Sequence, residues 1–252
     1  MNKHVKHEYW GDSIDYRDVL KKIEEIGPTL EAQAPADEEA GELTKETFEA
    51  LKPLRFSHLL ATEKLGGAQM RPTEVLELLS AVSWWSGSAG WVSMVHCCIG
   101  AMSAAFLPDS AVERLFAPGT DNRFSGQGAP LGMLKKVEGG YRLTGKWSYG
   151  SGFSHATWSH SACFIDDGEG KPAKDENGDV MVMCAHAPIE EHKQLGNWDV
   201  LGLKGTGSID RTMRQVPEHF HAHWRDPNWL SRRWTERPST YSGVGGERSL
   251  LK

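Results

Sequence analysis

The spacing of apolar residues changes once along the chain, near Pro118, and this change constrains the fold more than any other feature. Before it, as over residues 19–26, apolar side chains recur every three or four positions, a spacing typical of helices. After it, apolar and polar residues alternate, a spacing typical of strands. Helices and strands in separate blocks predict an α+β fold, with a helical domain at residues 1–118 and a β domain at residues 119–220.

The first half is predicted to hold a series of helices. Gly27-Pro28 is expected to end the first one, because proline lacks the amide hydrogen that a helix interior needs. Thr44 marks the start of a second helix, and Pro72 suits the first turn of a third. The apolar run Ala89–Leu107 is about long enough to cross a bilayer, but its Gly, Ala and Ser content favours a helix buried in protein.

The second half is predicted to hold two strand pairs. Residues 133–137 and 141–143 form one pair across a glycine turn, and residues 156–165 and 180–187 form the other. We therefore expect an antiparallel sheet in this domain. Residues 221–252 show no sustained period, so they are predicted to be an irregular tail without regular structure.

Composition excludes several classes of protein. The 252 residues carry 28 basic and 34 acidic side chains, a net charge of -6, which argues against nucleic acid or an anionic membrane as the partner. The four cysteines form neither a CxxC pair nor a disulfide framework, and the first residues lack an apolar signal segment. We therefore expect a reducing, cytoplasmic location. The histidines and cysteines fit no zinc template, so no metal is expected.

Two glycine-rich segments are candidates for facing a ligand. Gly202–Ser208 offers backbone amides and hydroxyls, yet it matches neither the phosphate-binding loop nor the dinucleotide-binding pattern, and alone it is typical of a turn. A strand over residues 145–152 would place Trp147, Tyr149 and Ser151 on one face, with two rings and a hydroxyl against a flat partner. Core packing is the commoner reason for such an aromatic stripe.

Several motifs occur together and in a fixed order over roughly residues 15–220. They are Gly87–Val92, Ser125–Gly132, Gly139–Gly152, Gly196–Leu203, Gly205–Asp210 and Val216–His219. This ordered set resembles the acyl-CoA dehydrogenase fold family, and within it most closely the two-component flavin-dependent monooxygenases, the branch of aromatic hydroxylases and dibenzothiophene monooxygenase. The chain departs from the family at Arg211 and Arg214, where apolar residues are usual.

The resemblance implies a flavin, FMN or FAD, that a separate flavin reductase reduces and that serves to hydroxylate a small aromatic or heteroaromatic substrate. Such a site needs apolar and aromatic walls, a hydroxyl near flavin N5 and a base near the substrate. By resemblance, Ser151 supplies the hydroxyl near N5 and also counts as a catalytic candidate, and Trp198 lies close to the ring system. The other cofactor-binding candidates are Ser125, Tyr149, Thr206 and Ser208.

The resemblance implies that the middle domain is β-barrel-like. The family also has a C-terminal four-helix domain, which completes the flavin site and builds homotetramers. We expect that domain to be absent from this sequence, as a truncated gene or a shifted reading frame would leave it. Two alternatives therefore stay open: an acyl-CoA dehydrogenase that oxidises an acyl-CoA with FAD, and a truncated, non-catalytic remnant. Ala129–Gly132 stands in place of the dehydrogenase pattern and favours the monooxygenase.

His96 is the second catalytic candidate. It lies on an apolar stripe with Val92 and Ile99, so it is expected to face the protein interior. One interpretation is a core histidine with its hydrogen bonds satisfied. The other is an acid or base beside the substrate, with a lowered pKa.

Overall fold

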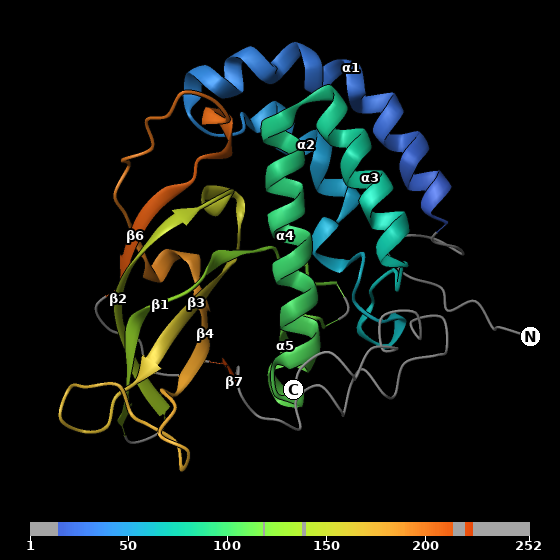
Figure 1. The fold of residues 1–252 in the computed structure, drawn as a ribbon. Coiled ribbons are helices and arrows are strands. Elements are labelled where there is room, and N and C mark those ends of the chain that lie inside the picture. Colours follow the sequence, from blue (N-terminus) through green and yellow to red (C-terminus); the bar gives the residue numbers. More distant parts are fainter. Residues whose placement is uncertain (1–14, 118, 138–139, 214–219, 224–252) are drawn as a thin grey trace, which may run out of the picture.

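The computed structural model describes residues 15–117, 119–137, 140–213 and 220–223, with helices first and strands second (Figure 1). The α-helices are α1 (Tyr16–Ala40), α2 (Lys45–Leu51), α3 (Pro72–Trp85), α4 (Gly87–Phe106) and α5 (Asp109–Leu115). The short 3-10 helices are η1 (Lys52–Leu54), η2 (Phe56–His58), η3 (Glu63–Leu65), η4 (Phe153–His155), η5 (Ile189–Glu191) and η6 (Lys204–Thr206). The strands are β1 (Phe124–Val137), β2 (Gly140–Gly150), β3 (Trp158–Ile165), β4 (Val182–Pro188), β5 (Lys193–Gln194), β6 (Ile209–Met213) and β7 (Phe220–His223).

Helix α1 corrects the prediction that Gly27-Pro28 ends the first helix. The helix continues through Pro28 and Pro35 to Ala40. Both prolines lie on its exposed face, so the carbonyl groups that lose a partner can bond to water. Gly27 lies on the buried face, where a Cβ would come within 2.2 Å of the Trp85 ring. Close packing against α3 therefore outweighs the local proline signal.

Helix α4 connects the helical layer to the sheet. It packs against α3 on one side and β1 on the other (Figure 1). Within the described residues it is the one helix that length and composition would allow to cross a membrane, and 61% of its apolar window is buried inside the protein. A second apolar cluster, which includes Ile99, Leu107 and Phe124, joins α4 and α5 to the strands. The run is thus a core helix in this fold.

The sheet is mixed, which corrects the prediction of an antiparallel, barrel-like domain. Its strand order is β5-β6-β2-β1-β3-β4-β7. The two predicted strand pairs, β1 with β2 and β3 with β4, are antiparallel as expected, but β1 and β3 run parallel. After β2 the chain crosses through η4 back to the beginning of β1, and that return makes the parallel pair. Over the described residues the sheet does not close into a barrel.

Strand β7 corrects the prediction that residues 221–252 hold no regular structure. It pairs with β4 in antiparallel register, with Phe220 opposite His186. Pairing with a distant strand is invisible to a local pattern, because the hydrogen bonds come from residues far away in the sequence. The predicted turn at residues 138–139 and the remainder of the predicted tail lie outside the described residues, and the domain boundaries at residues 118 and 220 stay predictions.

Arg211 occupies a fully buried position on β6. Its guanidinium lies 5.6 Å from the Trp147 ring and 4.8 Å from the Phe153 ring. Nη2 donates to His160 O at 3.1 Å and to Ser161 Oγ at 3.2 Å, whereas Nε and Nη1 have no hydrogen-bond partner among the described residues. Burial lowers the pKa of Arg211 to about 9. The buried charge of Arg211 therefore lowers the free energy of unfolding.

Replacing this arginine by an apolar side chain is expected to stabilise the protein. Arg211→Met keeps the aliphatic stem and removes the buried charge, so we expect the free energy of unfolding at pH 7.5 to rise by about 1–4 kcal/mol. The gain should shrink as pH rises above about 9, because the wild-type arginine then loses its proton in the folded state. Urea unfolding checks this, with exposed Arg142→Met as the control; a less stable Arg211→Met variant would contradict it.

Candidate functional site

Three side chains from two distant segments form a hydroxyl cluster, which consists of Ser151, Thr206 and Ser208. Ser151 Oγ lies 2.6 Å from Ser208 Oγ, which in turn lies 2.8 Å from Thr206 Oγ1. Trp91 on α4 donates its Nε1 hydrogen to Ser151 Oγ at 3.0 Å. All three hydroxyl-bearing residues are buried. The fold thus brings three of the predicted site residues together, at a point where α4, the end of β2 and η6 meet.

The backbone that follows Ser151 is held from three sides. Ser125 Oγ on β1 donates to Ser151 O at 2.6 Å. Gly152 N donates to Thr206 O at 2.8 Å, and His96 Nε2 lies 3.1 Å from Gly152 O. Gly152 has a φ of +63°, and a Cβ there would lie 2.9 Å from His96 Nε2, so this position requires glycine. Two further predicted residues, Ser125 and His96, therefore support the loop that carries Ser151.

An aromatic rim, made of Trp91, Tyr149 and Trp198, lies beside the hydroxyl cluster. Tyr149 is 65% exposed and Trp91 is 46% exposed, so both rings are accessible to a ligand. The rings of Tyr149 and Trp198 meet edge to face, with centroids 6.0 Å apart. Trp198 Nε1 donates to Lys204 O of η6 at 3.1 Å. Exposed flat surfaces next to buried hydroxyl groups suit a planar ligand with a polar edge.

The predicted face shared by Trp147, Tyr149 and Ser151 is wrong. Trp147 is fully buried in the sheet core and donates its Nε1 hydrogen to Ala162 O at 2.9 Å, whereas Tyr149 faces outward. The register between β2 and β6 shifts after Trp147, and Tyr149 has a φ of +58°. Such a bulge breaks the two-residue alternation of a strand. The bulge is what turns the Tyr149 ring out of the core.

Trp91 is the site residue that the sequence interpretation missed. It lies in the Gly87–Val92 motif, but its partner Ser151 is 60 residues away, and no spacing rule links the two. The sequence offered one signal for Trp91. This large ring follows Ser88, Ala89 and Gly90 near the start of a helix made mostly of small residues. A large ring in such a setting marks a contact of that helix with another segment or a ligand.

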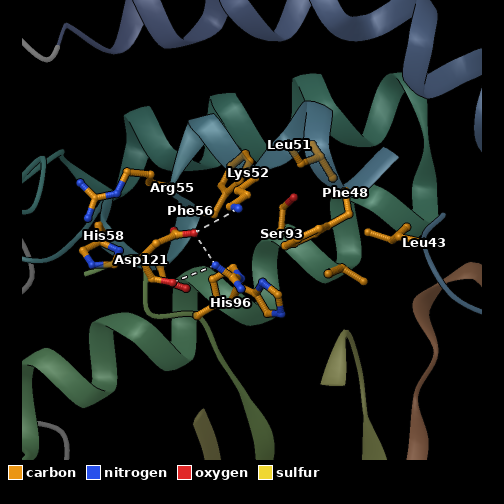
Figure 2. Close-up of a pocket in the computed structure, with 13 residues that line it drawn as sticks. Leu43, Phe48, Leu51, Lys52, Arg55, Phe56, His58, Ser93, His96 and Asp121 are labelled. Carbon is orange, nitrogen blue, oxygen red and sulfur yellow. Dashed lines mark hydrogen bonds and ion pairs between the residues drawn. The ribbon is translucent and has the colours of Figure 1, made fainter. Parts of the chain in front are cut away.

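His96 also lines a pocket with about 400 Å³ of empty space, part of it open to solvent (Figure 2). Apolar side chains such as Phe48 form much of its wall. On another side, Asp121 forms ion pairs with Lys52 at 4.0 Å and with Arg123 at 2.5 Å, drawn as dashed lines in Figure 2. His96 thus lies between this pocket and the loop that carries Ser151.

A pair of buried histidines lies elsewhere in the sheet. His160 Nδ1 and His186 Nε2 are 3.2 Å apart, and Ser103 Oγ lies 2.8 Å from the same His186 nitrogen. Over the described residues, no group of three or more His, Cys, Asp or Glu side chains is placed to hold a metal ion. The expectation of no metal stays a prediction for the chain as a whole.

The His96 ring is neutral at pH 7. Burial lowers its pKa to about 4, although the hydrogen bond with Gly152 O acts in the opposite direction. Because a carbonyl oxygen accepts, Nε2 carries the hydrogen and donates, which leaves the lone pair on Nδ1. Both interpretations of His96 survive: the donated bond is a structural role, and the free lone pair suits a base.

Two substitutions at His96 test its structural role, the hydrogen bond that it donates to Gly152 O. Glutamine can replace the Nε2 donor but has no basic nitrogen, so His96→Gln is expected to keep the unfolding free energy within about 1 kcal/mol of wild type. His96→Ala leaves Gly152 O without its donor and should destabilise by about 2–3 kcal/mol. Urea unfolding of the two variants tests the structural role. Equal losses in both variants would show that the donated bond is not what His96 contributes.

The chain matches no model of a known protein family. It is 31% identical over 223 residues to the flavin-dependent monooxygenase oxygenase subunit HsaA of Mycobacterium tuberculosis, which covers 86% of this chain and 54% of that protein. It is 27% identical over 209 residues to the oxygenase component of an FADH2-dependent resorcinol hydroxylase of Rhizobium sp., which covers 80% and 48%.

A solved structure of a hydroxylase is also similar to this chain. The crystal structure of 3-HSA hydroxylase from Rhodococcus sp. RHA1 superimposes with a TM-score of 0.73 at 28% identity, over 83% of this chain and 53% of that one. The chain is similar to oxygenase subunits of flavin-dependent monooxygenases. It spans about half the length of the curated relatives it matches. The wider likeness to the acyl-CoA dehydrogenase fold stays a prediction.

Proposed function

We propose that the chain carries a flavin-binding surface of a monooxygenase oxygenase component, which hydroxylates a small aromatic or heteroaromatic compound with reduced flavin and dioxygen. The observation that carries the proposal is the hydroxyl cluster beside the aromatic rim, built from segments far apart in the sequence. The names of the relatives describe the same class of activity, including a resorcinol hydroxylase. Their description as an oxygenase subunit or component supports a separate flavin reductase as the partner.

The residues fit the shape and polarity of a flavin, either FMN or FAD. Trp91 and Tyr149 offer exposed rings on which a planar ring system can pack. Ser151 Oγ provides a hydroxyl at the edge of that surface, and Ser208 Oγ orients it. Ser125 is fully buried and donates to Ser151 O, so we assign it to holding the loop instead of contacting the flavin.

The contacts within the hydroxyl cluster determine which acceptor the Ser151 hydroxyl can donate to. Trp91 Nε1 donates to Ser151 Oγ, so the serine hydrogen is free to point either to Ser208 Oγ or to a ligand atom. A bound reduced flavin would supply two electrons to dioxygen, so that one oxygen atom enters the aromatic ring as hydroxyl and the other leaves as water. The neutral His96 would hold the loop that carries Ser151 by donating to Gly152 O, and its role as a base beside the substrate stays a prediction.

Isotope labelling tests the reaction class. The purified chain is mixed with chemically reduced FMN or FAD, ¹⁸O₂ and either resorcinol or indole, and the products are analysed by mass spectrometry. We expect a hydroxylated product that carries one ¹⁸O atom, and less of it with Ser151→Ala. The exposed Ser80→Ala variant on α3 is the matched control and should behave as wild type.

Two results would contradict the proposal. One is a product without the label, because a monooxygenase takes the new oxygen atom from dioxygen. The other is the absence of labelled hydroxylation, combined with bleaching of oxidised FAD when the chain is mixed with an acyl-CoA in a separate anaerobic sample, which would identify the dehydrogenase alternative. A cytoplasmic location remains part of this proposal.

A further inference from the structure

Glu38, near the end of α1, accepts hydrogen bonds from two other segments. Ser88 Oγ of α4 donates to its Oε1 at 2.5 Å. From η6, Lys204 N donates to Oε2 at 2.9 Å and Gly205 N donates to Oε1 at 3.0 Å. The η6 residues are more than 160 positions away in sequence, and Figure 1 shows α1 passing over this part of the chain. A single carboxylate therefore ties three segments together.

The two segments that Glu38 holds are the ones that carry the candidate site. Ser88 lies three residues before Trp91, so it stands about one turn away on the same helix. Lys204 and Gly205 immediately precede Thr206 of the hydroxyl cluster. The distance between Trp91 and that cluster thus depends on how η6 sits against the beginning of α4.

The η6 segment needs an external anchor. It is flanked by two residues with left-handed backbone, Leu203 with a φ of +57° and Gly207 with a φ of +52°. A left-handed conformation is unfavourable for leucine, and the two amides at the start of η6 have no helical partner of their own. A carboxylate satisfies both amides at once, and charged acceptors form the stronger hydrogen bonds.

The surroundings also favour a negative charge at Glu38. It lies at the N-terminus of the 20-residue helix α4, where a helix stabilises anions. Partial burial raises its pKa, but hydrogen bonds from Ser88, Gly205 and Lys204 outweigh that effect and lower the pKa below its usual value. Its neighbour Glu39 is exposed.

We infer that Glu38 is a positioning residue, whose carboxylate fixes η6 against α4 and thereby sets the spacing between Trp91, Ser151 and Ser208. The expected effect of Glu38 on flavin binding rests on the proposed function. The anchoring of η6 by Glu38 is independent of that function, because it follows from the three hydrogen bonds alone. Glu38→Ala removes all three bonds. Glu38→Gln keeps one acceptor oxygen but points an NH2 group at a backbone N–H, so it should have an intermediate effect.

Amide hydrogen exchange measures the hold directly in the full chain. We expect exchange at Lys204 and Gly205 to be at least tenfold faster in Glu38→Ala than in wild type, and intermediate in Glu38→Gln. Amides in α3 should exchange at the wild-type rate, which separates loss of an anchor from general destabilisation. Glu39→Ala is the matched control and should match wild type throughout.

Equilibrium dialysis with FMN and with FAD measures the consequence for the site. For whichever flavin the wild type binds, we expect the Kd to rise at least tenfold in Glu38→Ala and to stay within twofold in Glu39→Ala. Unchanged exchange at Lys204 and Gly205 in Glu38→Ala would overturn the inference. If the wild type binds neither FMN nor FAD, the proposed function is overturned, and the exchange rates still decide whether Glu38 holds η6.

Discussion

At pH 5 the protein is expected to be less stable than at pH 7.5 by about 6 kcal/mol, because three buried histidines must stay neutral in the folded state. Burial is the main cause in each case, and it lowers the pKa to about 3 for His58 and to about 4 for His96 and His160. The unfolded chain binds these protons near pH 6.5. Each histidine then disfavours the folded state by about 2 kcal/mol at pH 5.

A histidine with a lowered pKa takes up its proton in the unfolded chain first, so stability is lost as pH falls from about 6.5 toward 4. Urea midpoints measured between pH 5 and 7.5 test this. His58→Phe should reduce the pH dependence by about one third, since the His58 ring already meets the Phe116 ring edge to face at 5.3 Å and its Nε2 has no partner among the described residues. A midpoint that does not change with pH would contradict the account.

Gly126→Ala is expected to prevent stable folding of the sheet, with a loss of about 4 kcal/mol or more. Gly126 lies on β1 opposite His160 of the parallel strand β3. A Cβ at this position would lie 1.8 Å from His160 O, which is a backbone atom and cannot rotate away. Relief therefore requires β1 and β3 to separate, and that would also displace Ser125 from Ser151 O.

Thermal unfolding of the purified variant measures this effect. Gly202→Ala is the matched control, because a Cβ at Gly202 meets no atom within 4 Å and its φ is not in the left-handed region. We expect the control to unfold within a few degrees of wild type. A Gly126→Ala protein that is as stable as the control would mean that the β1–β3 pairing is not as close as described.

Local sequence patterns were sufficient where neighbours in sequence decide the structure. The apolar stripe of α3 and the antiparallel pairs β1–β2 and β3–β4 follow from spacing alone. The stop at Gly27-Pro28 failed because burial of the α1 stripe against α3 outweighs one missing hydrogen bond. The parallel β1–β3 pair was out of reach, since its register depends on where the chain returns after β2.

In the candidate site too, some residues could be identified from the sequence and others only from contacts between distant segments. Resemblance selected Ser151, Thr206 and Ser208, and the fold places their hydroxyls within 2.8 Å of a neighbour. The contact of Trp91 and the anchoring by Glu38 were missed, because each joins segments that no motif connects. Residues that hold a site in place leave little local signal, whereas glycine turns and hydroxyl runs leave a recognisable one.

Anaerobic equilibrium dialysis of the full chain with dithionite-reduced FMN or FAD tests the central claim most directly. The account predicts saturable binding at one site with a micromolar Kd, weakened at least tenfold by Trp91→Ala. Trp84→Ala, which removes an 84% exposed ring on α3, should leave the Kd unchanged. Absence of saturable binding at millimolar flavin, or equal effects of the two tryptophan variants, would contradict the claim that the hydroxyl cluster and aromatic rim hold a flavin.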